Sequence, residues 1–187
     1  MNRITRYLLL FFALLVLGKI MDAQDRVPKV LTISGPNALS LRFTDPLEGL
    51  YRHAEILKAG QKPVPLDLSS DDPSEVMLVD GLDANGRNGL FKFKLRKDLP
   101  WSLRVWSLDG RYVVLVTYTL RNGHIDIRNE RYTNAYDTQT GKPVVFSGKS
   151  KYLSNDSFEQ WSPTKPDVAI LFTGSNPPKE EAFPQKD

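Results

Sequence analysis

The chain has 187 residues, with 25 lysines and arginines against 22 aspartates and glutamates and a formal net charge of +3. Its first 23 residues hold three of these cations and one acid, so the rest of the chain is close to neutral. A near-neutral domain has no basic excess with which to neutralise phosphates, which excludes nucleic acid as a partner. Cysteine is absent, which is more typical of the Gram-negative periplasm than of small extracellular eukaryotic domains.

The N-terminal segment has the layout of a secretory signal peptide. Two arginines precede ten consecutive apolar residues at 8–17, and a polar exit follows. A ten-residue helix is about 15 Å long, half of a hydrocarbon core of about 30 Å, whereas a signal peptide needs only about 7–15 apolar residues. We predict a signal peptide at 1–23 and a periplasmic location. Ala23 and Gly18 can both precede a cleavage point, and an uncleaved segment that anchors the protein in the inner membrane is the alternative.

Two strands are predicted at the start of the mature chain. Residues 30–34 are a short β-branched run. Residues 37–44 alternate, with Leu39, Leu41 and Phe43 on one face and polar side chains on the other. This alternation is typical of a half-buried strand.

A helix is predicted at 47–59, the best helical candidate of the mature chain. Leu50, Ala54 and Leu57 recur there at helical spacing, and Gly60 stands where a glycine commonly ends a helix. The proline-rich, acidic stretch that follows is expected to be a loop.

The remainder of the chain predicts short strands joined by turns. The strongest strand is 111–120, bounded by Asp109-Gly110 and by the hairpin signal Asn122-Gly123. Its apolar residues 113–116 predict a central strand that is buried on both faces. Further strands are expected at 75–80, 90–95, 103–106, 131–137, 143–147 and 168–173.

These elements together predict a mainly β fold in one domain at 24–174. The strands are mostly linked by hairpins, which favours a single antiparallel sheet, a sandwich or a partial barrel, with the one helix near its N-terminal side. Residues 175–187 are rich in proline and charge and are expected to be a flexible tail.

One pair of turn motifs resembles a known family. Residues 106–115 read Trp-Ser-Leu-Asp-Gly-Arg-Tyr-Val-Val-Leu, and residues 136–143 read Tyr-Asp-Thr-Gln-Thr-Gly-Lys-Pro. Together they resemble a blade of a β-propeller of the Tol-B or WD40-like kind, where S-x-D-G-R opens an inner strand and D-x-x-T-G-K closes an outer hairpin. Trp161-Ser162-Pro163 and the following 167–170 repeat the first half. Roughly 40 residues match, without a regular repeat, so the resemblance implies antiparallel hairpins and not a propeller.

The sequence contains no motif for a metal or cofactor site. The two histidines, His53 and His124, are 71 residues apart, and no cysteine completes a ligand set. The glycine-rich stretch 81–89 lacks both the glutamate of an EF-hand and the Gly-Lys-Ser/Thr of a phosphate loop. We therefore expect no bound metal, nucleotide or other cofactor.

Two functions remain open. The export signal, the near-neutral charge and the missing chemistry favour a non-enzymatic binding protein of the bacterial envelope with a protein partner. One concrete form is an immunity protein that neutralises a toxin acting in the periplasm. The alternative is a periplasmic hydrolase that uses paired carboxylates, either in the loop 67–75 or at Asp126 and Glu130.

A partner-binding surface is predicted in the stretch that mixes charge with aromatic area. Arginine and tyrosine are enriched among the residues that dominate binding energy. An exposed charged hairpin without a binding role is the alternative. The residues of this predicted surface are Asp126, Arg128, Glu130, Arg131 and Tyr132.

Export is directly testable. Expressed in a Gram-negative cell, the protein should be released with the periplasmic fraction, and sequencing of its N-terminus should find the apolar run removed. A cytosolic protein that retains Met1 would contradict this prediction, and a membrane-bound one would indicate the uncleaved anchor.

Overall fold

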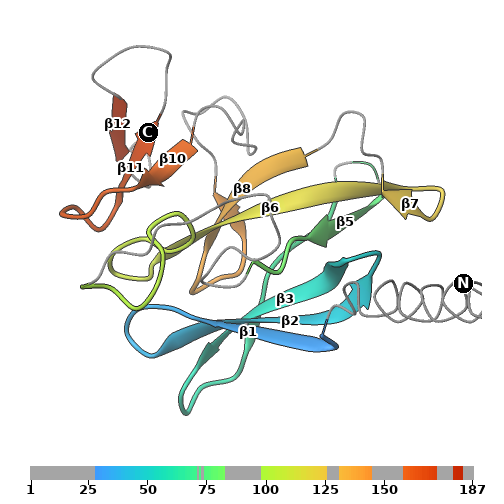
Figure 1. The fold of residues 1–187 in the computed structure, drawn as a ribbon, viewed down its shortest axis with the longest axis horizontal. Helices are drawn as coiled ribbons and strands as arrows, with labels where there is room; N and C mark the ends of the chain where they lie inside the picture. The colour runs from blue at the N-terminus through green and yellow to red at the C-terminus, as the bar shows by residue number, and fades with distance from the viewer. Residues whose placement is uncertain are drawn as a thin grey trace, which may run out of the picture.

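Every regular element that the structure describes is a β-strand (Figure 1). The computed structural model describes residues 28–70, 72, 74–82, 98–125, 131–144, 158–171 and 179–182. Its strands are β1 (Val30–Ser34), β2 (Leu39–Leu47), β3 (Leu50–Lys58), β4 (Val64–Pro65), β5 (Val76–Val79), β6 (Tyr112–Arg121), β7 (His124–Ile125), β8 (Arg131–Asp137), β9 (Pro143–Val144), β10 (Phe158–Trp161), β11 (Val168–Leu171) and β12 (Lys179–Ala182).

The described strands pair only in the antiparallel sense, so the mainly β, antiparallel fold is confirmed. They form a nine-stranded sheet with the main order β1-β2-β3-β5-β6-β8-β9, and a three-stranded sheet of β10, β11 and β12. The signal segment predicted at 1–23 and the strand predicted at 90–95 lie outside the described residues.

The large sheet begins with a meander of three strands. β1 pairs with β2, and β2 with β3, along their lengths. Leu41 and Phe43 are fully buried, so the apolar face predicted for this strand does face the core. Glu48 and Gly49 join β2 to β3 with φ of 50° and 89°. Two successive positive φ values are the signature of a type I′ turn, which matches the twist of the strands it connects.

The helix predicted at 47–59 is wrong, because this segment is the end of β2, the turn and β3. The helix-like spacing of its apolar residues arises because the alternation of buried and exposed side chains is interrupted along β3. Ala54 and Ile56 are buried in alternation, but farther back along the strand Leu50 and Tyr51 are buried side by side. A helix of about 12–15 residues is marginal by itself in water. β3 instead obtains backbone partners from β2, starting at the tight turn.

β6 lies at the centre of the second half of the large sheet. It pairs with β5 on one side and with β8 on the other. Val113, Val114, Leu115 and Val116 are each at most 4% exposed, which confirms the prediction of a strand buried on both faces. The hairpin predicted at Asn122-Gly123 is also present, since both residues have positive φ and lead into β7.

The strand predicted at 103–106 forms turns instead. The backbone N–H groups of Val105 and Trp106 both donate to the carbonyl of Ser102. Only an isolated bridge from Trp106 to Val113 and a hydrogen bond from the N–H of Val114 to the carbonyl of Val105 join this segment to β6. It lies beside the start of β6, beyond the part that pairs with β5, so its apolar side chains are buried without an extended backbone.

The small sheet is attached to the rest through Trp161 at the end of β10. The N–H of Trp161 donates to the carbonyl of Leu103, and its ring stacks on Tyr112 with centroids 5.7 Å apart. β12 pairs with β11, so part of the segment predicted as a tail is a strand. Its pairing partner is a buried strand that precedes it by only a short connection.

One hydrophobic core is shared by the two sheets. β3 and β5 meet at a single pair, Tyr51 and Val79, and in Figure 1 the meander β1–β3 lies across from β6 and β8. No helix in the described part of the chain is long and apolar enough to cross a membrane. The largest fully buried side chains are Trp106, Trp161, Tyr51, Tyr136, Phe43, Leu41, Leu78 and Leu115.

A charge placed in β6 should be strongly destabilising. Val114→Asp puts a carboxylate at a position that is 4% exposed, which should lower the free energy of unfolding by ~3 kcal/mol or more. The control is Val30→Asp, the same substitution at a valine that is 54% exposed, which should cost ~0.5 kcal/mol or less. Urea denaturation measures both. Equal midpoints for Val114→Asp and the parent would contradict the assignment of β6.

Candidate binding cleft

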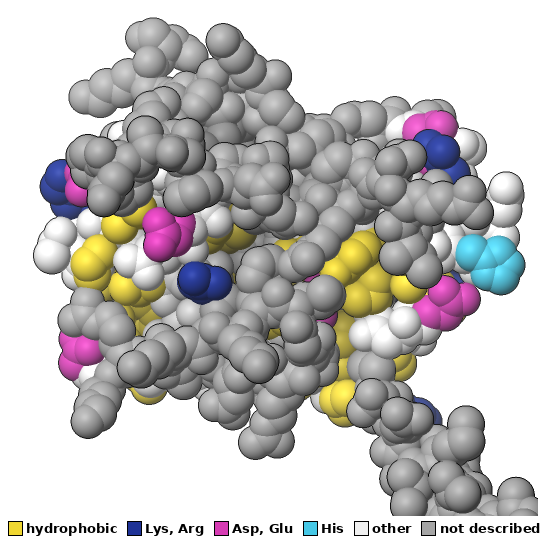
Figure 2. Space-filling view, turned by 45° about the horizontal axis from the view of Figure 1, so that its top comes forward, with side chains coloured by type: hydrophobic (Ala, Val, Ile, Leu, Met, Phe, Trp, Pro, Cys, Tyr) yellow, Lys and Arg dark blue, Asp and Glu magenta, His cyan; other side chains and the backbone are white. Residues whose placement is uncertain are grey.

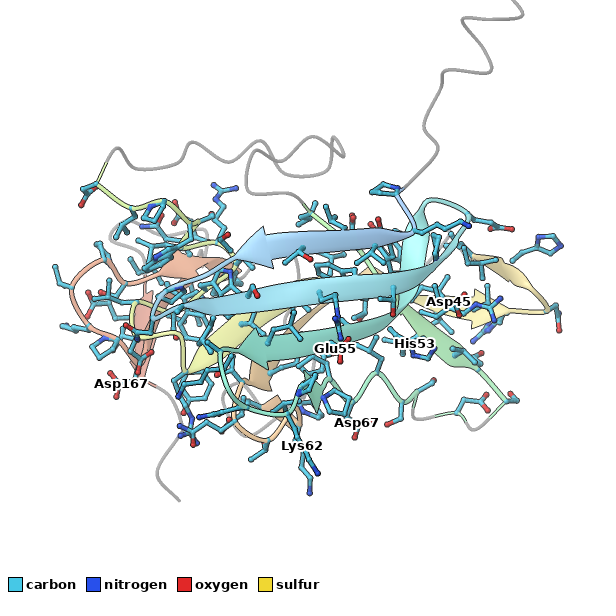
Figure 3. All side chains as sticks on the ribbon, turned by 90° about the horizontal axis from the view of Figure 1, so that it is seen from below. Asp45, His53, Glu55, Lys62, Asp67 and Asp167 are labelled. Atoms are coloured by element: carbon cyan, nitrogen blue, oxygen red, sulfur yellow. The ribbon has the colours of Figure 1, made fainter. Side chains whose placement is uncertain are left out.

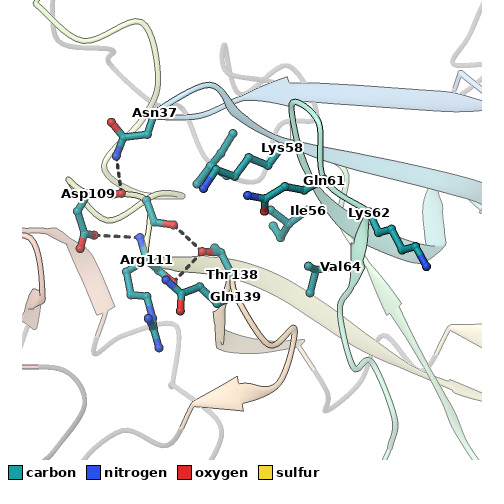
Figure 4. Close-up of a pocket in the computed structure, with 12 residues that line it drawn as sticks. Asn37, Ile56, Lys58, Gln61, Lys62, Val64, Asp109, Arg111, Thr138 and Gln139 are labelled. Carbon is teal, nitrogen blue, oxygen red and sulfur yellow. Dashed lines mark hydrogen bonds between the residues drawn. The ribbon is translucent and has the colours of Figure 1, made fainter.

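Four turns meet at one end of the large sheet and surround a cleft of about 560 Å³, which we name the turn cleft (Figure 4). They are the β1–β2 turn, the β3–β4 hairpin, the turn that precedes β6 and the β8–β9 turn. A cleft of this size is in the range of small-ligand sites. The residues that line it are Asn37, Leu39, Ile56, Lys58, Gln61, Lys62, Val64, Asp109, Gly110, Arg111, Thr138 and Gln139.

The turn before β6 is closed by its own side chains. The hydroxyl of Ser107 donates to Oδ1 of Asp109 (2.8 Å), and the N–H of Arg111 donates to the same oxygen (2.9 Å). The N–H of Tyr112 donates to the Ser107 hydroxyl, and the N–H of Ser107 donates back to the Tyr112 carbonyl. Serine and aspartate at these positions therefore set the shape of this wall.

The β8–β9 turn is organised around Asp137. Its Oδ1 accepts hydrogen bonds from the N–H groups of Gln139 (2.7 Å) and Thr140 (3.3 Å). The N–H of Gly141 donates to the Asp137 carbonyl. Gly141 has φ of 71°, and a Cβ there would lie 1.9 Å from the carbonyl oxygen of Pro65. Only glycine fits this position, which brings the turn against β4.

These two turns are tied together across the ends of β6 and β8. Arg111 Nη2 lies 2.6 Å from Oδ2 of Asp137, and this carboxylate is only 14% exposed. The Thr138 hydroxyl donates to the carbonyl of Gly110 (2.7 Å). The side-chain amide of Asn37 donates to the backbone carbonyl of Asp109 (2.8 Å), which adds the β1–β2 turn. One wall of the turn cleft is thus a connected hydrogen-bonded unit.

The opposite wall comes from the β3–β4 hairpin. In Figure 4 the amino group of Lys58 and the amide of Gln61 point across the cleft towards Asn37 and Asp109, whereas Lys62 points away. Figure 3 also shows Lys62 projecting outwards from the sheet. Neither lysine forms an ion pair with any residue that the structure describes.

The lining combines an apolar floor with a polar rim. Leu39, Ile56 and Val64 are the aliphatic residues, and Ile56 is 2% exposed. Eight of the twelve lining residues have polar side chains. The lining is therefore more polar than that of most small-molecule sites, which are predominantly hydrophobic.

The structure describes only part of the partner surface predicted from the sequence. Asp126, Arg128 and Glu130 lie outside the described residues. Arg131 and Tyr132 begin β8, whose opposite end carries the β8–β9 turn. Six residues of strand span about 20 Å, so the backbone of Arg131 lies about that far along β8 from the β8–β9 turn.

The two histidines lie apart on exposed positions. His53 is on β3, and its Nε2 is 3.8 Å from Oδ2 of Asp45, with both labelled in Figure 3. His124 is on β7, with its Nδ1 3.8 Å from Oε1 of Glu48. Among the described residues, no group of three or more histidines and carboxylates lies close enough to hold a metal ion.

The described acids of the loop 67–75 contact the loop itself or the neighbouring strand β6. Oδ1 of Asp67 accepts the N–H of Ser69. Asp72 accepts both the hydroxyl and the N–H of Ser74, and these hydrogen bonds lower the pKa of its carboxyl. Glu75 pairs with Arg121 of β6. Each of these three carboxylates therefore has a structural partner among the described residues.

The two turns that the sequence motifs predict form one wall of the turn cleft, although the sequence predicts no cleft there. The S-x-D-G-R and D-x-x-T-G-K patterns do form the two connected turns. The sequence does not predict a site at Lys58 and Gln61, because its patterns place the first in a helix and the second in a loop. Recognising Glu48-Gly49 as a hairpin turn is the signal that could have placed both at one end of a sheet.

Comparison with known proteins adds no relative. A scan against models of protein families gave no match, and no curated protein or solved structure is significantly similar to the chain. On the face drawn in Figure 2, the described acidic and basic side chains are scattered and form no patch of one sign.

The Asp137 carboxylate should be important for the stability of the connected turns. Asp137→Ala removes the acceptor of two backbone N–H groups and the partner of Arg111, so the free energy of unfolding should fall by about 1–3 kcal/mol. Gln139→Ala is the control, because Gln139 is exposed and its backbone N–H is retained. Thermal or urea unfolding should leave this second variant within ~0.5 kcal/mol of the parent. Equal losses for the two would show that Asp137 has no special role.

Proposed function

We propose that this protein is an exported, non-enzymatic binding protein of the bacterial envelope, and that it recognises a protein partner through the turn cleft. The observation that carries the proposal is the convergence of four turns on one polar-rimmed cleft. One wall is braced by Arg111, Asp137 and Thr138, which supports recognition by a preformed surface. The side chains of Lys58 and Gln61 face that wall (Figure 4).

The chemistry of the cleft supports binding more than hydrolysis. Asp109 is the only carboxylate among its described lining residues, and its Oδ1 already accepts two hydrogen bonds. Glycosidic hydrolysis by paired carboxylates needs a second acid about 5–10 Å away across the substrate. No observation favours the hydrolase over the binding protein at this cleft.

An immunity protein for a toxin that acts in the periplasm is the concrete form that we propose. Such a protein needs an exported, stable domain with one surface complementary to the toxin, and no catalytic group. The braced turns provide rigidity, and an exposed cleft rim provides contact groups of both charges. In that case the toxin and this chain should form a stoichiometric complex.

Site-specific photo-crosslinking in living cells tests the proposal. A photoreactive residue in place of Gln139, on the rim of the turn cleft, should give a protein adduct in the periplasm that is visible as a shifted band. The control position is His53, whose side chain is 72% exposed on the sheet away from the cleft. Adducts at both positions alike, or at neither while the protein is exported, would overturn the assignment of the cleft.

A further inference from the structure

We propose that the turn cleft takes a carboxylate group of its partner, an aspartate or glutamate side chain on an exposed acidic segment. In this arrangement Lys58 provides the positive charge, and the side-chain amides of Gln61 and Gln139 donate hydrogen bonds. The inference rests on the proposed function, because it names the chemistry of the partner at the same cleft.

The charges of the lining residues favour an anion. Lys58, Lys62 and Arg111 are opposed by a single acid, Asp109. The guanidinium of Arg111 forms an ion pair with Asp137, which is not itself a lining residue. Apart from that pair, the lining holds two lysines against Asp109, which leaves a net charge of +1, and of the two lysines only Lys58 points into the cleft (Figure 4).

The hydrogen-bond donors of the cleft also favour an anionic ligand. Lys58, Gln61 and Gln139 are exposed, and their side chains make no hydrogen bond with any described residue. The ammonium group and the two amide NH₂ groups are therefore hydrogen-bond donors without an acceptor among the described residues. A carboxylate is acceptor-only when ionised and can satisfy several of these donors at once.

The aliphatic floor of the cleft favours a protein segment over a simple inorganic anion. The aliphatic side chains of Leu39, Ile56 and Val64 can cover the carbon stem of a glutamate or a neighbouring apolar side chain.

Titration with a defined peptide tests the carboxylate site. We would record backbone amide NMR spectra of the ¹⁵N-labelled mature protein while adding a blocked tetraglutamate peptide, with tetraglutamine as the uncharged probe. Saturable shifts are expected for the amides around Lys58, Gln61 and Gln139, and tetraglutamine should bind at least fivefold more weakly. Lys58→Gln should weaken tetraglutamate binding at least fivefold.

Lys62→Gln is the matched control, since it removes the same charge from the same hairpin but from a side chain that points away. It should change the affinity less than twofold. Equal effects of the two substitutions, or no saturable shift in this region, would overturn the carboxylate site. Tighter binding of a tetragalacturonate than of the peptide would overturn the assignment to a protein segment. If crosslinking still finds a partner at the cleft, only the ligand chemistry is wrong; if the peptide binds but no adduct forms, the proposed function fails instead.

Discussion

The burial of β6 on both faces is the constraint on which the rest of this fold depends. A strand with apolar side chains on both sides needs cover above and below, and backbone partners along both edges. β8 supplies one edge, and the other is divided between β5 and the turn segment that ends at Trp106. The meander β1–β3 and the small sheet contribute to the same core, with Trp161 stacked on Tyr112 at the start of the strand.

The turn cleft is a consequence of how the strands end. β6 begins and β8 ends at the same place, so the turns attached to them lie side by side and can share hydrogen bonds. Their ion pair, between Arg111 and Asp137, removes one cation from the cleft and leaves the charge of Lys58 on the facing wall. A braced wall opposite a single inward lysine is the arrangement on which we base the proposal that the cleft takes an acidic group.

The two Trp-Ser segments of the chain are alike in structure as well as in sequence. In each, a fully buried tryptophan bridges to a β-strand after a turn, and the serine N–H bonds back to that strand, at Tyr112 in the first and Val168 in the second. The Ser162 hydroxyl accepts backbone N–H groups within its turn, as Asp109 does in the other. This agrees with the antiparallel hairpins that the propeller-like motifs imply, although the strands assemble into one bent sheet and a small one.

Local chemistry determined much of this protein by itself. Alternation in 37–44, the apolar run 113–116 and the turns at Asn122 and Asp137 each act within a few residues, and each has the predicted structure. The helix predicted at 47–59 failed because its apolar spacing was compatible with two structures, and pairing with β2 decided between them.

The turn cleft was decided only by the tertiary structure. Lys58, Arg111 and Gln139 are far apart in the chain, and the order of the strands in the sheet is what brings their turns to one end. Such non-local contacts depend on the free energy of the whole packed core, which no short stretch of sequence contains.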